Sequence, residues 1–223
     1  MRKYRVKAAS DVRIGYGIEL SAGLRLFGET AGYAPSFEAV NNELDVAYNR
    51  RRGLQKPMRE ARAAFRFAQF DADQTIRMVH RAAEITDGGR QNGPVATRCF
   101  PNGLGPVVAP QGMRQIPPTE KLVADLQRCN LPGSDGFRTE WLPRLEAALA
   151  NLKTAAEAYR LARKAYMDAF QDEVALRAEH YQAVDKIMGL VRAAFPNDRA
   201  RQDVIFPEVD DGDHGDGDNE EDP

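Results

Sequence analysis

One helical pattern constrains the fold of this chain more than any other feature of its sequence. From Phe37 to Thr86, apolar or small residues recur at steps of three and four, which places them along one face of an α-helix. At about 1.5 Å per residue such a helix would be roughly 75 Å long, too long to bury that face against a compact core. It therefore needs a partner of similar length, and residues 138–195 repeat the pattern. The sequence predicts a mainly α fold built on a long antiparallel helical hairpin or coiled-coil-like bundle.

The first long helix is expected over residues 35–87, with Ser36 as its N-cap. Gly53 and Pro57 interrupt its middle, and a proline inside a helix removes a backbone donor and clashes with the preceding turn. This predicts a kink near residues 53–57, with two consecutive helices as the alternative. The apolar periodicity continues in register across the interruption, which favours the kink.

The second long helix is expected over residues 137–196, and its pattern resembles the first. A shift of 101 residues aligns Leu44 with Leu145 and Phe65 with Tyr166. Two hypotheses explain this equally well: duplication of a helical unit, or a chance match between two patterns rich in Ala, Leu and Arg. Both give the same paired helices.

Residues 1–34 show a different pattern, in which apolar residues alternate with Arg, Gly or Glu as in a half-buried strand. We therefore expect an N-terminal β-hairpin arm, with a turn at residues 21–23 and a third strand available at residues 4–8. An amphipathic helix over residues 17–27 is the alternative, because glycines weaken a strand. The alternating residues are Val12, Ile14, Tyr16, Ile18 and Leu20.

Residues 88–136 are expected to form a long Gly/Pro-rich loop, because residues 88–118 contain six glycines and six prolines. Loops of this length tend to be functional, disordered or linkers. A short helix is expected over residues 119–128, and a short strand at residues 204–207.

The charge of the chain is unevenly distributed. The whole sequence has 31 basic and 33 acidic residues, but residues 203–223 contain ten acids and no Lys or Arg. Residues 1–202 therefore have 31 basic and 23 acidic residues, a net charge of +8. We expect residues 197–223 to be a disordered acidic tail on a basic body. This division is typical of a nucleic-acid surface with a competing tail, or of a solubilising end.

A row of basic side chains follows one face of the first long helix beside the apolar face. Such a row can track a phosphate backbone, with an affinity that falls steeply with salt. The favoured interpretation is a solvated flank, whose arginine stems cover the apolar face and whose charges pair with the partner helix. The row consists of Arg52, Lys56, Arg59, Arg62 and Arg66.

Three phenylalanines lie close together in the same helix and do not share one face. Phe65 belongs to the main apolar face, whereas Phe67 and Phe70 point to other sides. A two-helix hairpin would leave Phe67 and Phe70 in water, so a third element or another subunit is expected to cover them. Together, Phe65, Phe67 and Phe70 form a candidate interaction patch.

Signatures of catalytic and metal chemistry are weak. The sequence has no GxSxG, Walker A or helix-opening GxGxxG motif. His80 has Glu84 one turn away and His180 has Glu173 two turns away, but no histidine has the Glu-x-x-His spacing of bundle metal sites. Cys99 and Cys129 are expected to be reduced thiols. We therefore expect no cofactor, no metal site and no catalytic residues.

The sequence thus predicts a non-enzymatic structural or protein-interaction protein, cytoplasmic and without a membrane segment, that self-associates or belongs to a larger assembly. Nucleic-acid binding along the basic row, inhibited by the acidic tail, is the first alternative. A helical-bundle metal carrier or enzyme is the second.

Overall fold

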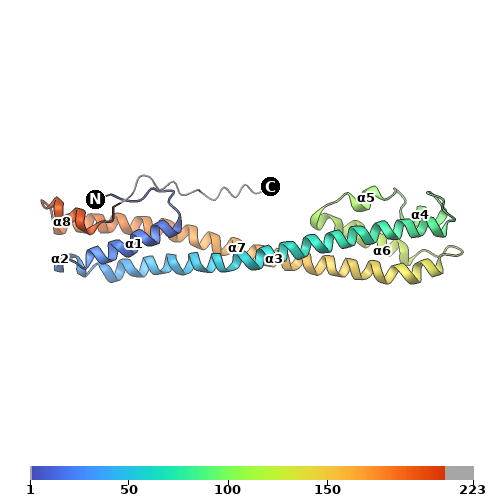
Figure 1. The fold of residues 1–223 in the computed structure, drawn as a ribbon, viewed down its shortest axis with the longest axis horizontal. Helices are drawn as coiled ribbons and strands as arrows, with labels where there is room; N and C mark the ends of the chain where they lie inside the picture. The colour runs from blue at the N-terminus through green and yellow to red at the C-terminus, as the bar shows by residue number, and fades with distance from the viewer. Residues whose placement is uncertain (1, 209–223) are drawn as a thin grey trace. The chain divides into compact units, whose positions relative to one another are not determined.

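The computed structural model describes residues 2–208, and all regular secondary structure in that range is helical (Figure 1). The chain divides into two compact units: unit 1 is Met1–Gln55 with Ala165–Pro223, and unit 2 is Lys56–Lys164. In chain order, the helices are α1 (Ser10–Leu24), α2 (Gly28–Ala31), α3 (Ala34–Thr86), α4 (Pro94–Cys99), α5 (Gly105–Val108), the 3₁₀ helix η1 (Gly112–Gln115), α6 (Ile116–Gln127), α7 (Asp135–Ala194) and α8 (Arg199–Ile205).

The two long helices, α3 and α7, pack together as the periodicity predicts. In unit 1, Asn41 contacts His180, and ten residues further along α3, Arg51 contacts Glu173. The numbers rise along one helix and fall along the other, so the two helices run antiparallel. The prediction of a mainly helical, antiparallel pair is confirmed.

Helix α3 is continuous through Gly53 and Pro57. The alternative of two consecutive helices is therefore wrong for this segment. Proline costs the helix one backbone hydrogen bond, but most of the stability of a long helix comes from packing of its apolar face. That face packs against α7 both before and after the proline, so the helical conformation persists.

Unit 1 adds α1 and α8 to its parts of α3 and α7, and α1 lies alongside both long helices (Figure 1). Its core joins Leu20 of α1, Phe37 of α3, Val184 of α7 and Ile205 of α8, all less than 5% exposed. Four elements therefore share one apolar core.

The β-hairpin expected over residues 1–34 is wrong, because residues 10–24 form helix α1 and residues 4–8 form no strand. The alternation of apolar residues does not mark a buried face here, because Val12 and Ile18 are exposed on the outer side of the helix. The inner side includes the polar side chains of Ser10, Arg13 and Ser21, which a hydrophobic pattern does not count. The helix over residues 17–27, weighed as the alternative, was closer.

The short strand expected at residues 204–207 is also wrong, because α8 occupies residues 199–205. Its N-cap is Asp198, whose side chain accepts a hydrogen bond from the Arg201 backbone N–H at 3.0 Å. The rest of the predicted acidic tail, residues 209–223, lies outside the described residues.

Unit 2 adds a cap to its parts of α3 and α7. Residues 88–118, expected as a loop, contain α4, α5 and η1, and Asp87 anchors α4 by accepting hydrogen bonds from the backbone N–H groups of Val95 and Ala96. Helix α6 packs Leu122 and Leu126 into the unit 2 core. Unit 2 thus has its own apolar centre.

Candidate functional site

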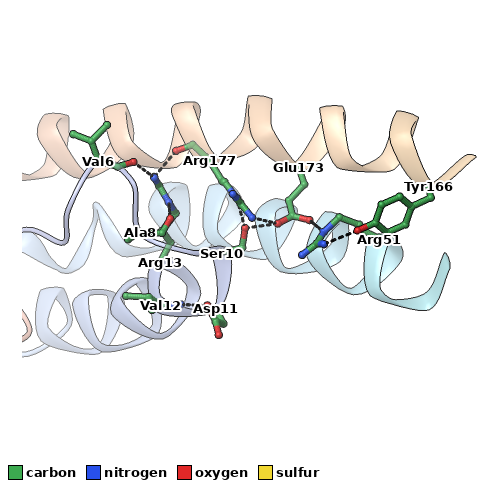
Figure 2. A network of polar contacts seen from close by, with 10 residues as sticks. All are labelled: Val6, Ala8, Ser10, Asp11, Val12, Arg13, Arg51, Tyr166, Glu173 and Arg177. Atoms are coloured by element: carbon green, nitrogen blue, oxygen red, sulfur yellow. Dashed lines mark hydrogen bonds and ion pairs between the residues drawn. The ribbon is translucent and has the colours of Figure 1, made fainter. Parts of the chain in front are cut away.

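The most connected polar site is a cluster in unit 1 that joins α1, α3 and α7 (Figure 2). We call it the polar cluster; its residues are Ser10, Arg13, Arg51, Tyr166, Glu173 and Arg177.

Glu173 of α7 lies at the centre of the polar cluster, and its side chain is fully buried. Its Oε1 accepts hydrogen bonds from Ser10 Oγ at 2.5 Å and from Arg177 Nη2 at 2.6 Å. Its Oε2 accepts one from Arg51 Nε at 2.5 Å, and Arg51 Nη1 reaches the Tyr166 hydroxyl at 3.1 Å. Both carboxylate oxygens are therefore engaged.

These contacts decide the charge of the cluster. Burial alone would raise the pKa of Glu173, but the hydrogen bonds from Ser10, Arg177 and Arg51 outweigh it and lower the pKa below its ordinary 4.5. Burial would lower the pKa of Arg51, and the hydrogen bonds to Tyr166 and Glu173 raise it instead. The cluster thus keeps a buried carboxylate paired with guanidinium groups at neutral pH.

Arg13 of α1 fixes the segment that precedes its helix. Its side chain donates to the carbonyl oxygens of Val6, Ala8 and Arg177, the last two at 2.9 and 2.8 Å. The guanidinium also lies 4.9 Å from the centre of the Tyr4 ring. Arg13 therefore ties residues 4–8 and α1 to the backbone of α7.

A second buried polar group in unit 1 is His180 of α7. Its Nδ1 lies 2.7 Å from the Tyr4 hydroxyl and its Nε2 lies 3.0 Å from Asn41 Oδ1. Burial, with smaller effects from the charges of Arg13 and Lys3, lowers the pKa of His180 to about 4. A neutral imidazole fits both contacts, with Tyr4 donating to Nδ1 and Nε2–H donating to Asn41.

Sequence reasoning missed both polar sites. Ser10 and Glu173 are 163 residues apart, and Tyr4 and His180 are 176 apart. In the sequence each of these polar residues looks like a surface residue, because its burial depends on partners that are distant along the chain.

The pairs considered for metal binding do not come together as ligand sets: Glu173 and His180 bind other partners, and His80 Nδ1 lies 3.8 Å from Glu84 Oε1 in unit 2. Within the described chain, no group of three or more His, Cys, Asp or Glu side chains is arranged to hold a metal ion.

The predicted basic row divides between the two units. Arg52, in unit 1, lies against the ring of Tyr48 at 5.4 Å, and Lys56, in unit 2, pairs with Glu60 at 3.8 Å. The other three members are exposed in unit 2, and none of them has an ion-pair or hydrogen-bond partner among residues 2–208. They are Arg59, Arg62 and Arg66.

The three phenylalanines separate as their helical positions predict. Phe65 is buried and stacks on Tyr159 of α7, with ring centres 6.0 Å apart. Phe67 and Phe70 are 70% and 60% exposed. The cover expected for them within the chain is absent from the described residues, since α6 packs elsewhere in the unit 2 core.

Phe67 and Phe70 belong to a longer exposed row, which we call the outer stripe. Its seven residues recur at steps of three and four along α3, on the side opposite the face that meets α7. Met78 and Ile85, 48% and 69% exposed, are the other two large apolar side chains of this row. The outer stripe consists of Ala63, Phe67, Phe70, Gln74, Met78, Arg81 and Ile85.

A small cavity of about 210 Å³ lies in the cap of unit 2, and its lining includes Cys99, Phe100, Val107 and Leu122. Burial and the neighbouring Cys129 thiol raise the pKa of Cys99 to about 12. The thiol is therefore protonated and a poor nucleophile at neutral pH.

Two further observations bear on the class of protein. No helix among residues 2–208 is long and apolar enough to span a membrane. Comparisons with protein-family models, with curated proteins and with solved structures find no match for this chain.

Proposed function

We propose that this is a non-enzymatic helical protein that binds another protein chain through the outer stripe of α3, as a homo-oligomer or as part of a larger assembly. The observation that carries the proposal is the exposure of four large apolar side chains on one helix face. Large apolar side chains grouped on one exposed helix face are typical of interaction sites, and aromatic side chains are enriched at the centres of interfaces. Those four side chains are Phe67, Phe70, Met78 and Ile85.

The polar sites support a structural role. Glu173 has both oxygens engaged and His180 has both ring nitrogens engaged, so each serves to hold helices together. The two free, buried thiols of Cys99 and Cys129 support a reducing, cytoplasmic location.

Photocrosslinking in the native cell tests this proposal. A photoreactive phenylalanine analogue replaces Phe67, and the same analogue at Asn151, exposed on α7 of unit 2, is the matched control. We expect a discrete adduct of higher mass from position 67 and none from position 151. Equal labelling at both positions, or none at either, would refute an interface on the outer stripe.

Nucleic-acid binding is the second candidate function. It is favoured by the exposure of Arg59, Arg62 and Arg66 without ion-pair partners within residues 2–208, next to two exposed aromatic rings. Changing all three to Glu would then weaken RNA or DNA binding and reduce the salt slope by about 3, one per lost phosphate contact. Deleting residues 208–223 would strengthen binding at low salt. If neither change affects binding, with Lys186→Glu as the single-charge control, this candidate is excluded.

A further inference from the structure

The spacing of the outer stripe is the same when read from either end. On each side of Gln74 the steps, counted outward, are four, three and four residues. Consider an antiparallel pair of copies related by a two-fold axis at Gln74, perpendicular to the helix. In this pair every stripe position lies opposite a stripe position of the other copy. The same rotation places corresponding sides of the two helices next to each other along the same edge of the interface. Closed two-fold pairing is the commonest form of self-association, and it requires a self-complementary surface.

We propose, on the basis of the protein-interaction function above, that the occupant of the outer stripe is a second copy of this chain. The two α3 helices lie antiparallel, with the two-fold axis at Gln74.

The pairs that this register creates are chemically compatible. Phe67 meets Arg81, and an arginine over an aromatic ring is a favourable contact. Phe70 meets Met78, and a thioether sulfur packs well against the edge of an aromatic ring. At the ends of the stripe the small Ala63 meets the larger Ile85, so the two helices can remain close along its whole length.

The polar members of the stripe select this arrangement over its alternatives. Gln74 meets its own copy on the axis, where two side-chain amides can hydrogen-bond, and a single polar residue in an apolar interface fixes the register. In a parallel, in-register pair, Arg81 would instead meet Arg81, placing two like charges in the interface.

The flank of the stripe adds charge complementarity. Arg62, Arg66 and Glu84 lie on the same side of α3, by the 100° turn per residue. In the antiparallel register Glu84 of one copy is opposite residue 64 of the other, between Arg62 and Arg66. Arginines that have no ion-pair partner among residues 2–208 thereby gain a carboxylate.

Cysteine crosslinking of the full-length chain tests the register. The native thiols of Cys99 and Cys129 are 2% and 0% exposed, so the unsubstituted chain treated with a short bis-maleimide is the background control. We expect a covalent dimer from Gln74→Cys, none from Ile85→Cys alone, and a dimer when Ile85→Cys and Ala63→Cys chains are mixed. Adding Phe67→Arg to Gln74→Cys places two arginines opposite each other in this register, and it should raise the concentration needed for half-maximal crosslinking about tenfold or more.

The outcomes separate this inference from the function on which it rests. Crosslinking of Ile85→Cys with itself would overturn the antiparallel register. No crosslinking at any of the three positions would overturn self-pairing. If in that case the photoreactive residue at position 67 still forms its adduct in the native cell, the protein-interaction function stands with a different partner. If that adduct is also absent, both proposals fail.

Discussion

The two units each add a third helix to the α3–α7 pair, and they do so by different chemistry. In unit 1, α1 combines apolar packing with a buried carboxylate, three arginines and a glycine in close contact with α3. In unit 2, α6 is held mainly by Leu122, Val123 and Leu126 in an apolar core. Polar contacts need specific partners at specific distances, whereas apolar packing tolerates more arrangements.

Both units have exposed apolar side chains, but along α3 the large ones are Val46 in unit 1 and the four of the outer stripe in unit 2. In unit 1, α1 lies along α3 and α7, and its polar contacts specify one docking position. In unit 2, α6 and the cap bury the inner side of α3 and leave the outer stripe in water. Unit 1 therefore fixes its third helix by internal polar contacts, whereas unit 2 exposes the row of side chains that we propose as an interface.

The largest effect is expected from removing the central carboxylate of unit 1. Glu173→Ala removes the buried counter-charge of the half-buried guanidinium groups of Arg51 and Arg177, and breaking a buried ion pair typically costs about 3–5 kcal/mol. Urea unfolding measures the change. Glu179→Ala, at an exposed position on the same helix, is the control and should change the free energy of unfolding by less than about 0.5 kcal/mol. Equal effects of the two substitutions would mean that the polar cluster does not anchor α1.

The corresponding change in unit 2 is apolar. Leu126→Ala removes a fully buried side chain and should cost about 2–5 kcal/mol, because it removes packing and leaves a cavity. Leu161→Ala, at a 52% exposed position on α7, should stay within about 0.5 kcal/mol of the unsubstituted chain. Unfolding curves in urea compare the two, and a neutral Leu126→Ala would contradict the apolar anchoring of α6.

Acid should weaken unit 1 through His180. Its pKa is about 4 in the folded chain and ordinarily 6.5, so between these values the unfolded chain binds more protons. Stability is therefore lost as the pH falls, by about 2 kcal/mol between pH 7 and pH 5. His180→Gln should remove this dependence and leave the loss that comes from Glu173 at lower pH. A stability independent of pH from 7 to 5 would contradict a buried neutral imidazole.

Two glycines of α1 should respond in opposite directions. A Cβ at Gly17 would overlap Asn41 Oδ1, whereas one at Gly15 would meet no atom within 4 Å. Gly17→Ala should therefore cost about 1–3 kcal/mol. Gly15→Ala should stabilise by about 0.5–1 kcal/mol, because alanine favours a helix. Thermal melts of both variants are the measurement, and the same sign for both would show that α1 does not approach α3 closely.

The smallest effect on stability is expected on the outer stripe. Phe67→Ala should change the free energy of unfolding by less than about 0.5 kcal/mol, measured in dilute solution where the chain is a monomer. Phe65→Ala, two residues earlier and 7% exposed, should cost about 3–5 kcal/mol. If Phe67→Ala were as destabilising as Phe65→Ala, the outer stripe would be part of a core.

The sequence was most informative where one pattern ran for many residues. Steps of three and four over some fifty residues predicted α3 and its partner, because a long helix must bury a continuous face. They also separated Phe65 from Phe67 and Phe70. In α1 the pattern was short. The polar residues Ser10 and Arg13 are buried on the inner side of this helix, whereas Val12 and Ile18 are exposed. A prediction based on hydrophobicity therefore chose the wrong period.

The polar cluster could not be predicted from the sequence. Its hydrogen bonds join α1 to α7 and α3 to α7 across more than a hundred residues of chain. No local signal distinguishes Glu173 from the exposed Glu179 six residues later on the same helix. Only the packing of the helices decides which carboxylate is buried, and hence which one needs arginine partners.

Sedimentation equilibrium of the intact chain measures directly whether two copies pair through the outer stripe. We expect a mass that rises with concentration from 24.8 kDa toward twice that value. The Phe67→Arg/Phe70→Arg variant should remain at 24.8 kDa with an unchanged free energy of unfolding. The same mass for both chains at every concentration would contradict self-pairing through the outer stripe.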